Sequence, residues 1–397
     1  MNITKDYNKN RNIMLQSILP KIPYQLCTKT VMDTTDPLIT FNSDGICNHA
    51  LNYEEYLQNG KPDPETSKTL MKQMVSNLKA EGKGKDYHCL IGLSGGVDSS
   101  YITWYVTKIL GLRPLVVHVD AGWNDEIAVS NIQNIVQKLN LDLHTIVIDW
   151  EIIKDLQVAY FKSSLANIDI PQDHAIISCM YEEARKYKIK NIINGNNMAT
   201  ESILPSTWGY DASDSIQIKS IHKEFGTKPL KDYPLMSVFK KFIYYPRILK
   251  LKSYSPLEWI DYNKQDAKNF MIKELGWKDY GGKHYESKFT RFFQAHYLPY
   301  KFGYDKRKAH LSSLIVSGQI TREEALEELK QPLYKPIEFQ SDRDYFIKKL
   351  GISLEEYERV MHTPVRSYTE FPNSKKLIDK IRKVYHPIKA FTKKFSK

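Results

Sequence analysis

The chain has 397 residues, of which 42% are hydrophobic and 26% charged, and its formal net charge is +11. This length is sufficient to bury a full core and predicts two or more structural units. No apolar run approaches the roughly 18 residues that span a bilayer, and the polar N-terminal stretch lacks the apolar block of a signal peptide. Four cysteines do not make a disulfide scaffold, so we expect a cytoplasmic protein.

The positive charge is concentrated at one end of the chain. Residues 375–397 contain nine basic residues and one acidic residue, and so carry +8 of the net +11. The remaining 374 residues carry only +3, so we expect no nucleic-acid partner. From Leu377 onward apolar residues recur at helical spacing with lysines on the other side. We expect a solvated end helix, with peripheral contact of this basic tail with a membrane as the alternative.

Residues 88–100 are expected to form a strand, a turn and a helix. Residues 89–93 are a short apolar run that ends in turn residues, which indicates a buried strand. Gly95 and Gly96 allow a sharp turn and a close approach of the backbone to a ligand. From Val97 onward apolar residues recur every three or four positions, which indicates a helix. The N–H groups and the dipole at the start of that helix predict an anion site.

Polar side chains surround this turn. The hydroxyls of Ser94, Ser99 and Ser100 add hydrogen-bond donors. Asp98 beside a phosphate implies a cation between them, so we predict that it binds magnesium. The Walker A pattern is absent, because no Gly-Lys-Ser/Thr follows the glycines. The run 94–99 instead resembles the phosphate loop of the PP-loop ATP pyrophosphatases, which implies cleavage of ATP between its α- and β-phosphates and adenylation of a substrate oxygen.

Further predicted strands alternate with helical segments. The strands are expected at 114–120, 143–149 and 191–194. This alternation predicts an α/β fold with a parallel twisted sheet flanked by helices, of the PP-loop or Rossmann type. Ligands of such sheets bind beyond the carboxyl ends of the strands.

The superfamily resemblance assigns ATP contacts at two of these strand ends. The end of the second strand receives the adenine ring in the resembled proteins, which implies contacts from Val119 and Asp120. A glycine-containing loop after the fourth strand closes on ATP, which implies contacts from Gly195 and Asn196. Glu201 is either a second magnesium ligand or a solvated acid in the first turn of a helix.

The region around Cys27 and Cys47 is similar to a small zinc ribbon. A structural zinc needs four ligands, commonly two Cys-x-x-Cys pairs. Thr30 and Ala50 occupy the positions of the second cysteine of each pair. We therefore expect packing without zinc, and a residual zinc site at Cys27 and Cys47 is the alternative.

A second polar block extends over residues 280–330. Glycine turns and aromatic residues frame Lys283, His284, Arg291, Lys306 and Arg307. Basic groups beside a phosphate loop suit a departing pyrophosphate and an anionic substrate. We predict that Arg291, Lys306 and Arg307 bind substrate or pyrophosphate. Lys283 and His284 are predicted to be catalytic together with Asp98, and a solvated charged surface is the alternative.

The whole chain resembles the N-acetyl sugar amidotransferases of bacterial surface-glycan biosynthesis. The shared features extend over about residues 24–330 and comprise the ribbon region and the runs 94–99, 194–196, 261–264, 280–287, 305–312 and 317–325. The resemblance implies that Mg–ATP adenylates an acetamido oxygen and that ammonia then replaces it, giving an acetamidino group in lipopolysaccharide or O-antigen biosynthesis. It also implies two ammonia-supplying partners, a glutaminase subunit and a cyclase-like subunit similar to those of histidine biosynthesis.

The expected organisation has four parts. These are an arm, the ribbon-like hairpin and a helix over 1–85, a PP-loop domain over 86–276, a helical region on the substrate and pyrophosphate side over 277–340, and a helical basic tail over 341–397. None of the four cysteines lies in a nucleophile elbow, which agrees with an outside ammonia source. A tRNA-thiolation enzyme is the alternative function, because it shares the loop and the adenylation step. The sequence leaves the identity of the sugar open.

Overall fold

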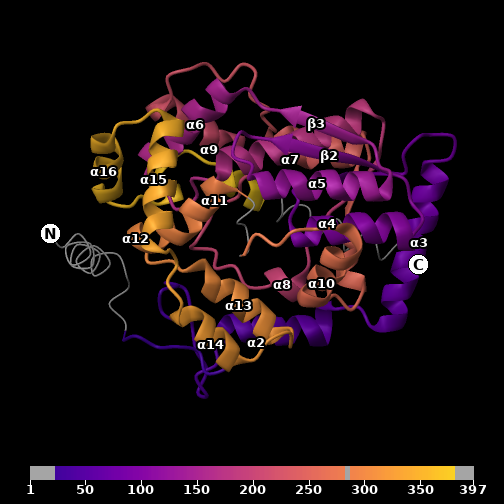
Figure 1. The fold of residues 1–397 in the computed structure, drawn as a ribbon, viewed down its shortest axis with the longest axis horizontal. Helices are drawn as coiled ribbons and strands as arrows, with labels where there is room; N and C mark the ends of the chain where they lie inside the picture. Colours follow the sequence, from indigo (N-terminus) through magenta and orange to yellow (C-terminus); the bar gives the residue numbers. More distant parts are fainter. Residues whose placement is uncertain (1–22, 282–286, 381–397) are drawn as a thin grey trace.

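A parallel β-sheet forms the centre of the protein. The computed structural model describes residues 23–281 and 287–380. The sheet has five strands in the order β3-β2-β1-β4-β5, and all four neighbouring pairs are parallel. Figure 1 shows β2 and β3 of this sheet with helices around them. The expected α/β fold class is therefore confirmed. The strands are β1 (Cys89–Gly92), β2 (Pro114–Asp120), β3 (Leu143–Val147), β4 (Asn191–Ile193) and β5 (Lys252–Tyr254).

Side chains of the strands alternate between two hydrophobic cores, one on each face of the sheet. In β1, Leu90 belongs to one core, whereas Cys89 and Ile91 belong to the other. This alternation follows from the two-residue repeat of a strand. The first core is covered by α6 (Trp150–Lys162), α7 (Ile170–Lys186) and α9 (Ser215–Phe225). The second is covered by α3 (Pro64–Glu81), α4 (Val97–Trp104), α5 (Glu126–Leu139) and α10 (Lys264–Leu275).

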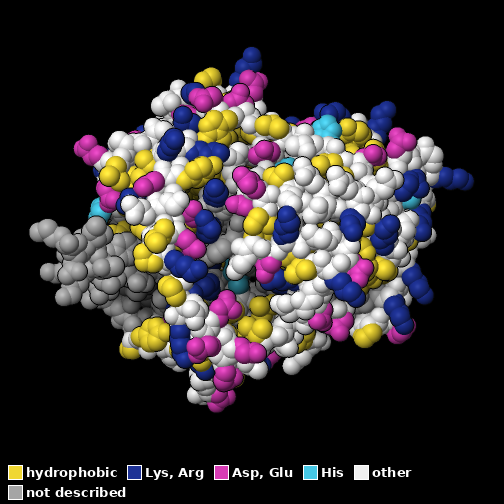
Figure 2. Space-filling view, in the orientation of Figure 1, with side chains coloured by type: hydrophobic (Ala, Val, Ile, Leu, Met, Phe, Trp, Pro, Cys, Tyr) yellow, Lys and Arg dark blue, Asp and Glu magenta, His cyan; other side chains and the backbone are white. Residues whose placement is uncertain are grey.

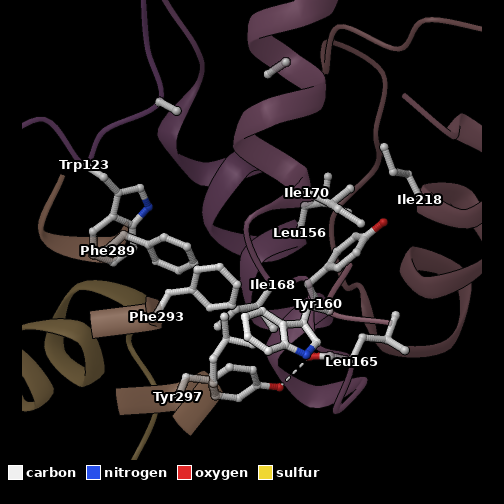
Figure 3. Packing of buried hydrophobic residues seen from close by; sticks show 14 of the residues in the cluster. Trp123, Leu156, Tyr160, Leu165, Ile168, Ile170, Ile218, Phe289, Phe293 and Tyr297 are labelled. Atoms are coloured by element: carbon white, nitrogen blue, oxygen red, sulfur yellow. Dashed lines mark hydrogen bonds between the residues drawn. The ribbon is translucent and has the colours of Figure 1, made fainter. Parts of the chain in front are cut away.

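Most helices from the last third of the chain pack onto the first core, whereas Leu311 and Ala325 form a small separate cluster with Val31. Phe289, Phe293 and Tyr297 lie beside Trp123 and Tyr160 (Figure 3). The ring centroids of Trp123 and Phe289 are 5.1 Å apart. The helices of this region are α11 (Lys288–Phe292), α12 (Leu298–Lys301), α13 (Lys306–Val316), α14 (Arg322–Lys330), α15 (Pro336–Leu350) and α16 (Leu354–His362). The proposed domain boundaries stay predictions.

Short helical segments complete the chain. They are α2 (Asn48–Glu55), α8 (Met198–Glu201), the π-helices at Tyr56–Gly60, Tyr105–Ile109, Lys240–Ile248 and Phe293–Tyr297, and the 3-10 helices at Pro256–Trp259 and Tyr368–Glu370. Within the described residues, every helix is too short or too polar to cross a membrane. The described part ends at residue 380, so most of the basic segment 375–397 lies outside it, and the expected solvated end helix and the alternative membrane contact stay predictions.

The ribbon-like segment has two isolated antiparallel bridges, Leu26–Asp33 and Phe41–Cys47, in place of continuous strands. Strand β5 ends at Tyr254, and Pro256 begins a 3-10 helix. Proline lacks the N–H that a central strand needs and suits the first turn of a helix, which explains why the strand ends before it.

Candidate functional site

The turn between β1 and α4 has the predicted strand–loop–helix geometry. Gly95 has φ +82°, and a Cβ there would lie 2.5 Å from the carbonyl oxygen of Ala128 on α5. Only glycine fits this position, because both the backbone angle and the contact exclude a side chain. Gly95 therefore packs the loop against α5, and its predicted contact with ATP stays a prediction.

Two serine hydroxyls hold the loop in shape. The Ser94 N–H donates to Ser99 Oγ at 3.3 Å, and Ser99 Oγ donates to the Gly96 carbonyl at 3.2 Å. No side chain among the described residues caps the start of α4, so the N–H groups of its first turn remain for an anion. Ser100 is fully buried and lies outside the cavity lining, because the next step of the helix turns it into the protein. Its predicted contact with ATP stays a prediction.

A cavity of about 620 Å³ lies beyond the carboxyl ends of the strands. On the face shown in Figure 2, basic and acidic side chains are interspersed and the surface is hollowed near its centre. The predicted residues that line the cavity come from well-separated parts of the chain and are Ser94, Gly96, Val97, Asp98, Ser99, Val119, Gly195, Asn196, Glu201 and Lys306. The fold thus brings together most of the sites that were predicted from separate motifs.

The loop after β4 packs directly on the first turn of α4. A Cβ on Gly195 would lie 2.9 Å from the backbone carbon and oxygen of Asp98. Asn197 caps α8 by accepting the Thr200 N–H at 2.9 Å, and its amide reaches Asp98 Oδ1 at 3.5 Å. Gly195 therefore permits the close approach of these two loops.

Asp98 is the acidic group at the centre of this contact. Tyr262 donates its hydroxyl hydrogen to Asp98 Oδ1 at 2.6 Å. Burial and the Asp98 carboxylate raise the pKa of Tyr262, so the phenol stays protonated and remains a donor.

The residues present fit a magnesium ion that arrives with a nucleotide. Asp98 and Glu201 line the same cavity, and carboxylate oxygens are the ligands that magnesium prefers. The described residues contain no group of three or more potential metal ligands. Magnesium commonly uses one or two carboxylates together with substrate phosphates, so two acids are sufficient.

Two residues predicted to bind ligands, Asp120 and Arg291, make hydrogen bonds or ion pairs within the protein. Asp120 accepts the Gly122 N–H at 2.7 Å and does not line the cavity. Arg291 makes a two-pronged ion pair with Asp342, with N–O distances of 2.6 and 2.7 Å. The structure thus gives both side chains partners within the protein, and the predicted adenosine contact of Asp120 and pyrophosphate contact of Arg291 stay predictions.

Arg307 is paired as well. It donates to Asp305 at 2.8 Å and to the carbonyl of Gln331 at 2.8 Å. It lines a neighbouring cavity of about 550 Å³ rather than the one at the phosphate loop. Lys283 and His284 lie outside the described residues, so their predicted catalytic roles stay predictions.

Sequence reasoning missed several residues of the cavity. His118 in β2 and Lys264 at the start of α10 both line it. His118 could have been found from the sequence, because it is a polar residue near the end of an otherwise apolar strand. Asp173 on α7 carried no such signal. Asp173 also lines the cavity, and its side chain is exposed there.

The cysteine-containing region is held by hydrogen bonds. Cys27 Sγ accepts the backbone N–H groups of Thr30 at 3.3 Å and Cys47 at 3.2 Å. Thr30 Oγ1 lies 3.6 Å from Cys47 Sγ. His49 is paired with Asp36 at 2.7 Å. Two thiols, with the nearby imidazole engaged by a carboxylate, do not fit a closed structural zinc site.

The C-terminal part of the chain is similar to a known protein family. Residues 286–385 match the family model described as "LPS biosynthesis protein WbpG-like, C-terminal domain". The match covers about a quarter of the chain and includes Arg291, Lys306 and Arg307. The resemblance to proteins of surface-glycan biosynthesis is thus confirmed for the WbpG-like domain.

One curated relative is an uncharacterized protein, MJ1599, of Methanocaldococcus jannaschii. It is 31% identical over 118 residues, which are 30% of this chain and 40% of that protein. The chain thus spans less than half of that protein's length.

Three solved structures are similar at 15% identity each. The first is an NMN synthetase from Francisella tularensis, with a TM-score of 0.29 and a match that covers 54% of this chain and 87% of that chain. The second is an NH3-dependent NAD synthetase from Campylobacter jejuni, with a TM-score of 0.28 and coverage of 76% of this chain and 99% of that chain. The third is the U34-tRNA thiolase NcsA from Methanococcus maripaludis with its [4Fe-4S] cluster, with a TM-score of 0.31 and coverage of 76% of this chain and 82% of that chain. At these TM-scores the likenesses carry no statement about activity.

Proposed function

We propose that this protein is an ATP-dependent carbon–nitrogen ligase of surface-glycan biosynthesis. It adenylates the acetamido oxygen of an N-acetyl sugar and replaces that oxygen with ammonia, which leaves an acetamidino group. The observation that carries the proposal is the cavity at the phosphate loop, into which Lys306 of the WbpG-like domain also reaches. The proposed phosphate-binding loop and a residue of the segment that matches the WbpG-like model thus line the same cavity.

The chemistry explains why ATP is required. An amide oxygen is a poor leaving group, so direct displacement by ammonia is slow. In the proposed reaction the acetamido oxygen attacks the α-phosphorus and pyrophosphate leaves. Ammonia then adds to the activated carbon, AMP departs with the former acetamido oxygen, and loss of a proton gives the acetamidino group.

The chain's own residues have distinct roles in this proposal. The first turn of α4 and the hydroxyls of Ser94 and Ser99 bind phosphate oxygens. Lys264 and Lys306 line the same cavity, where their charge favours the departing pyrophosphate. Asp98 and Glu201 would hold magnesium, which neutralises phosphate charge when it is bound.

The source of ammonia is proposed to be another protein. All four cysteines are buried, and burial raises the pKa of both Cys89 and Cys179. A hydrogen bond with Cys47 lowers the pKa of Cys27, but its thiol is buried as well. A glutaminase nucleophile needs an accessible thiolate, and buried thiols do not supply one. We therefore propose a separate glutaminase subunit together with a cyclase-like subunit that delivers ammonia. The buried cysteines also disfavour tRNA thiolation, which needs a reactive sulfur carrier.

The test is an incubation of the full chain with Mg–ATP, ammonium chloride and a panel of diacetamido sugars, both free and nucleotide-linked. We expect AMP, pyrophosphate and a sugar whose mass has changed by the replacement of one oxygen with NH. Asp98→Asn is expected to abolish all three products. AMP release that depends on tRNA, without any sugar product, would contradict the proposal and support thiolation.

A further inference from the structure

Residues 261–264 form one of the motifs found in the sequence, and the proposed reaction gives its tyrosine, Tyr262, no role. Tyr262 follows the 3-10 helix at Pro256–Trp259 and immediately precedes the cap of α10. Its side chain is only 5% exposed, and its ring centroid lies 5.4 Å from that of Tyr101 on α4. The ring is therefore fixed by packing, and its hydroxyl is directed at the first turn of the helix that follows the phosphate loop.

That hydroxyl makes a short hydrogen bond to the proposed metal ligand. The distance from Tyr262 Oη to Asp98 Oδ1 is 2.6 Å, within the range of a charge-assisted O–H···O bond. The amide of Asn197 reaches the same oxygen at 3.5 Å. Among the described residues, no donor contacts Asp98 Oδ2. One carboxylate oxygen is thus held by the protein, and the other is left for a ligand.

We propose that Tyr262 is a positioning residue for metal binding. It orients Asp98 so that Oδ1 stays on the protein and Oδ2 serves as a single-oxygen ligand of the magnesium that accompanies ATP. This inference rests on the proposed function, since it concerns the metal–nucleotide complex of that site. The outer partners of a metal-binding carboxylate generally set its orientation and affinity.

Gln319, which lies in the part of the chain that matches the WbpG-like model, stabilises this arrangement through hydrogen bonds. The side-chain oxygen of Gln319 accepts the N–H of Lys264 at 2.9 Å. Its amide group lies 3.5 Å from the carbonyl of Tyr262 and 3.4 Å from that of Ala199. Gln319 therefore ties together the turn that carries Tyr262 and the helix α8 that ends at Glu201.

The variant Tyr262→Phe removes the hydroxyl and keeps the ring. We would measure the binding of manganese to the full chain by electron paramagnetic resonance, with and without a non-hydrolysable ATP analogue. We expect manganese affinity in the presence of the analogue to fall by about ten- to hundredfold, as for other residues that orient a metal ligand. Binding of the analogue without metal should not change.

A matched control separates positioning from general destabilisation. Tyr297 is fully buried, donates its hydroxyl hydrogen to the Leu165 carbonyl at 2.8 Å (Figure 3) and is not one of the residues that line the cavity. Tyr297→Phe should lower the unfolding temperature to a similar extent and leave manganese binding unchanged. In an Asp98→Asn background, Tyr262→Phe should cause no further loss of metal affinity, because it acts through Asp98.

The outcomes distinguish this inference from the proposed function. Equal manganese affinity in the wild type and Tyr262→Phe would overturn the role of Tyr262 and leave the ATP proposal standing. A wild-type chain that binds neither the nucleotide analogue nor manganese would overturn the proposed function and the inference with it. An equal loss in Tyr262→Phe and Tyr297→Phe would show that the effect is structural and would also contradict the positioning role.

Discussion

Gly195 lies in direct contact with the backbone of Asp98, so the loop after β4 and the first turn of α4 meet without an intervening side chain. A Cβ on Gly195 would lie 2.9 Å from the carbonyl carbon and oxygen of Asp98, and 3.2 Å from the Ser99 nitrogen. Backbone atoms cannot move aside to relieve a contact of this length, whereas the end of a flexible side chain can. The two loops must therefore move apart if residue 195 carries a side chain.

The variant Gly195→Ala is expected to weaken ATP binding by at least about tenfold, because it displaces the helix turn that holds the phosphates, with overpacking costing about 1–3 kcal/mol. Isothermal titration calorimetry with a non-hydrolysable ATP analogue would measure it. Gly209→Ala is the control, since its Cβ would meet only the Asn167 side chain. Unchanged nucleotide affinity in Gly195→Ala would contradict the proposed phosphate site.

Arg291 is expected to stabilise the fold rather than bind pyrophosphate. Asp342 is 5% exposed, so Arg291→Met would leave a buried carboxylate without its charged partner. Loss of one partner of a buried ion pair typically costs about 3–5 kcal/mol. Urea unfolding should show this loss, and the additional change Asp342→Leu should recover part of it. An undiminished stability combined with weaker pyrophosphate inhibition would contradict this assignment.

The cysteine region should accept zinc when its two missing thiols are supplied. Thr30 approaches both cysteines, and the backbone of Ala50 hydrogen-bonds to the Cys47 thiol. The double variant Thr30→Cys, Ala50→Cys should therefore bind cobalt with the absorption spectrum of a tetrahedral four-thiolate site. The unmodified chain should show no such spectrum, and a chelator should leave its thermal unfolding unchanged. A cobalt–thiolate spectrum in the unmodified chain would contradict the packing explanation.

Lys301 is expected to make the stability of the protein depend on pH. It is fully buried and donates to Ser164 Oγ at 3.0 Å and to the carbonyl of Val360. Burial lowers its pKa from 10.5 to about 7. Between these values the unfolded chain binds a proton that the folded chain does not, so the free energy of unfolding should rise with pH across this range.

Lys301→Met should remove this dependence, and its stability relative to the wild type should be greatest below pH 7. Urea unfolding across this pH range would measure the difference. Lys330→Met is the control, because the Lys330 side chain is 69% exposed. Parallel pH profiles for the wild type and Lys301→Met would contradict the assigned pKa shift.

The local part of the site could be predicted from the sequence. The glycine turn, the flanking apolar periods and the strand ends are encoded in short stretches, so the positions of Ser94, Asp98, Val119 and Gly195 at one edge of the sheet followed from a parallel topology. The burial of Ser100 could not be predicted, because the sequence does not show which side of a helix faces a cavity. The rotation of α4 decides that.

The long-range part could not be predicted from patterns. Arg291 lies 51 residues from Asp342, and Tyr262 lies 164 residues from Asp98. Nothing in the neighbourhood of either residue indicates its partner. A basic residue near aromatic side chains was interpreted as a ligand-binding group, whereas the structure pairs Arg291 with a buried acid. Tertiary packing alone determines these contacts.

The most direct test of the central claim follows the acetamido oxygen. The sugar that is converted in the panel experiment would be prepared with a heavy oxygen isotope in its acetyl carbonyl and incubated with the full chain, Mg–ATP and ammonium. Phosphorus NMR and mass spectrometry would locate the label. Attack of the acetamido oxygen on the α-phosphorus predicts that the label appears in AMP and that unlabelled pyrophosphate is released. Unlabelled AMP, or ADP with labelled inorganic phosphate, would contradict adenylation of the amide.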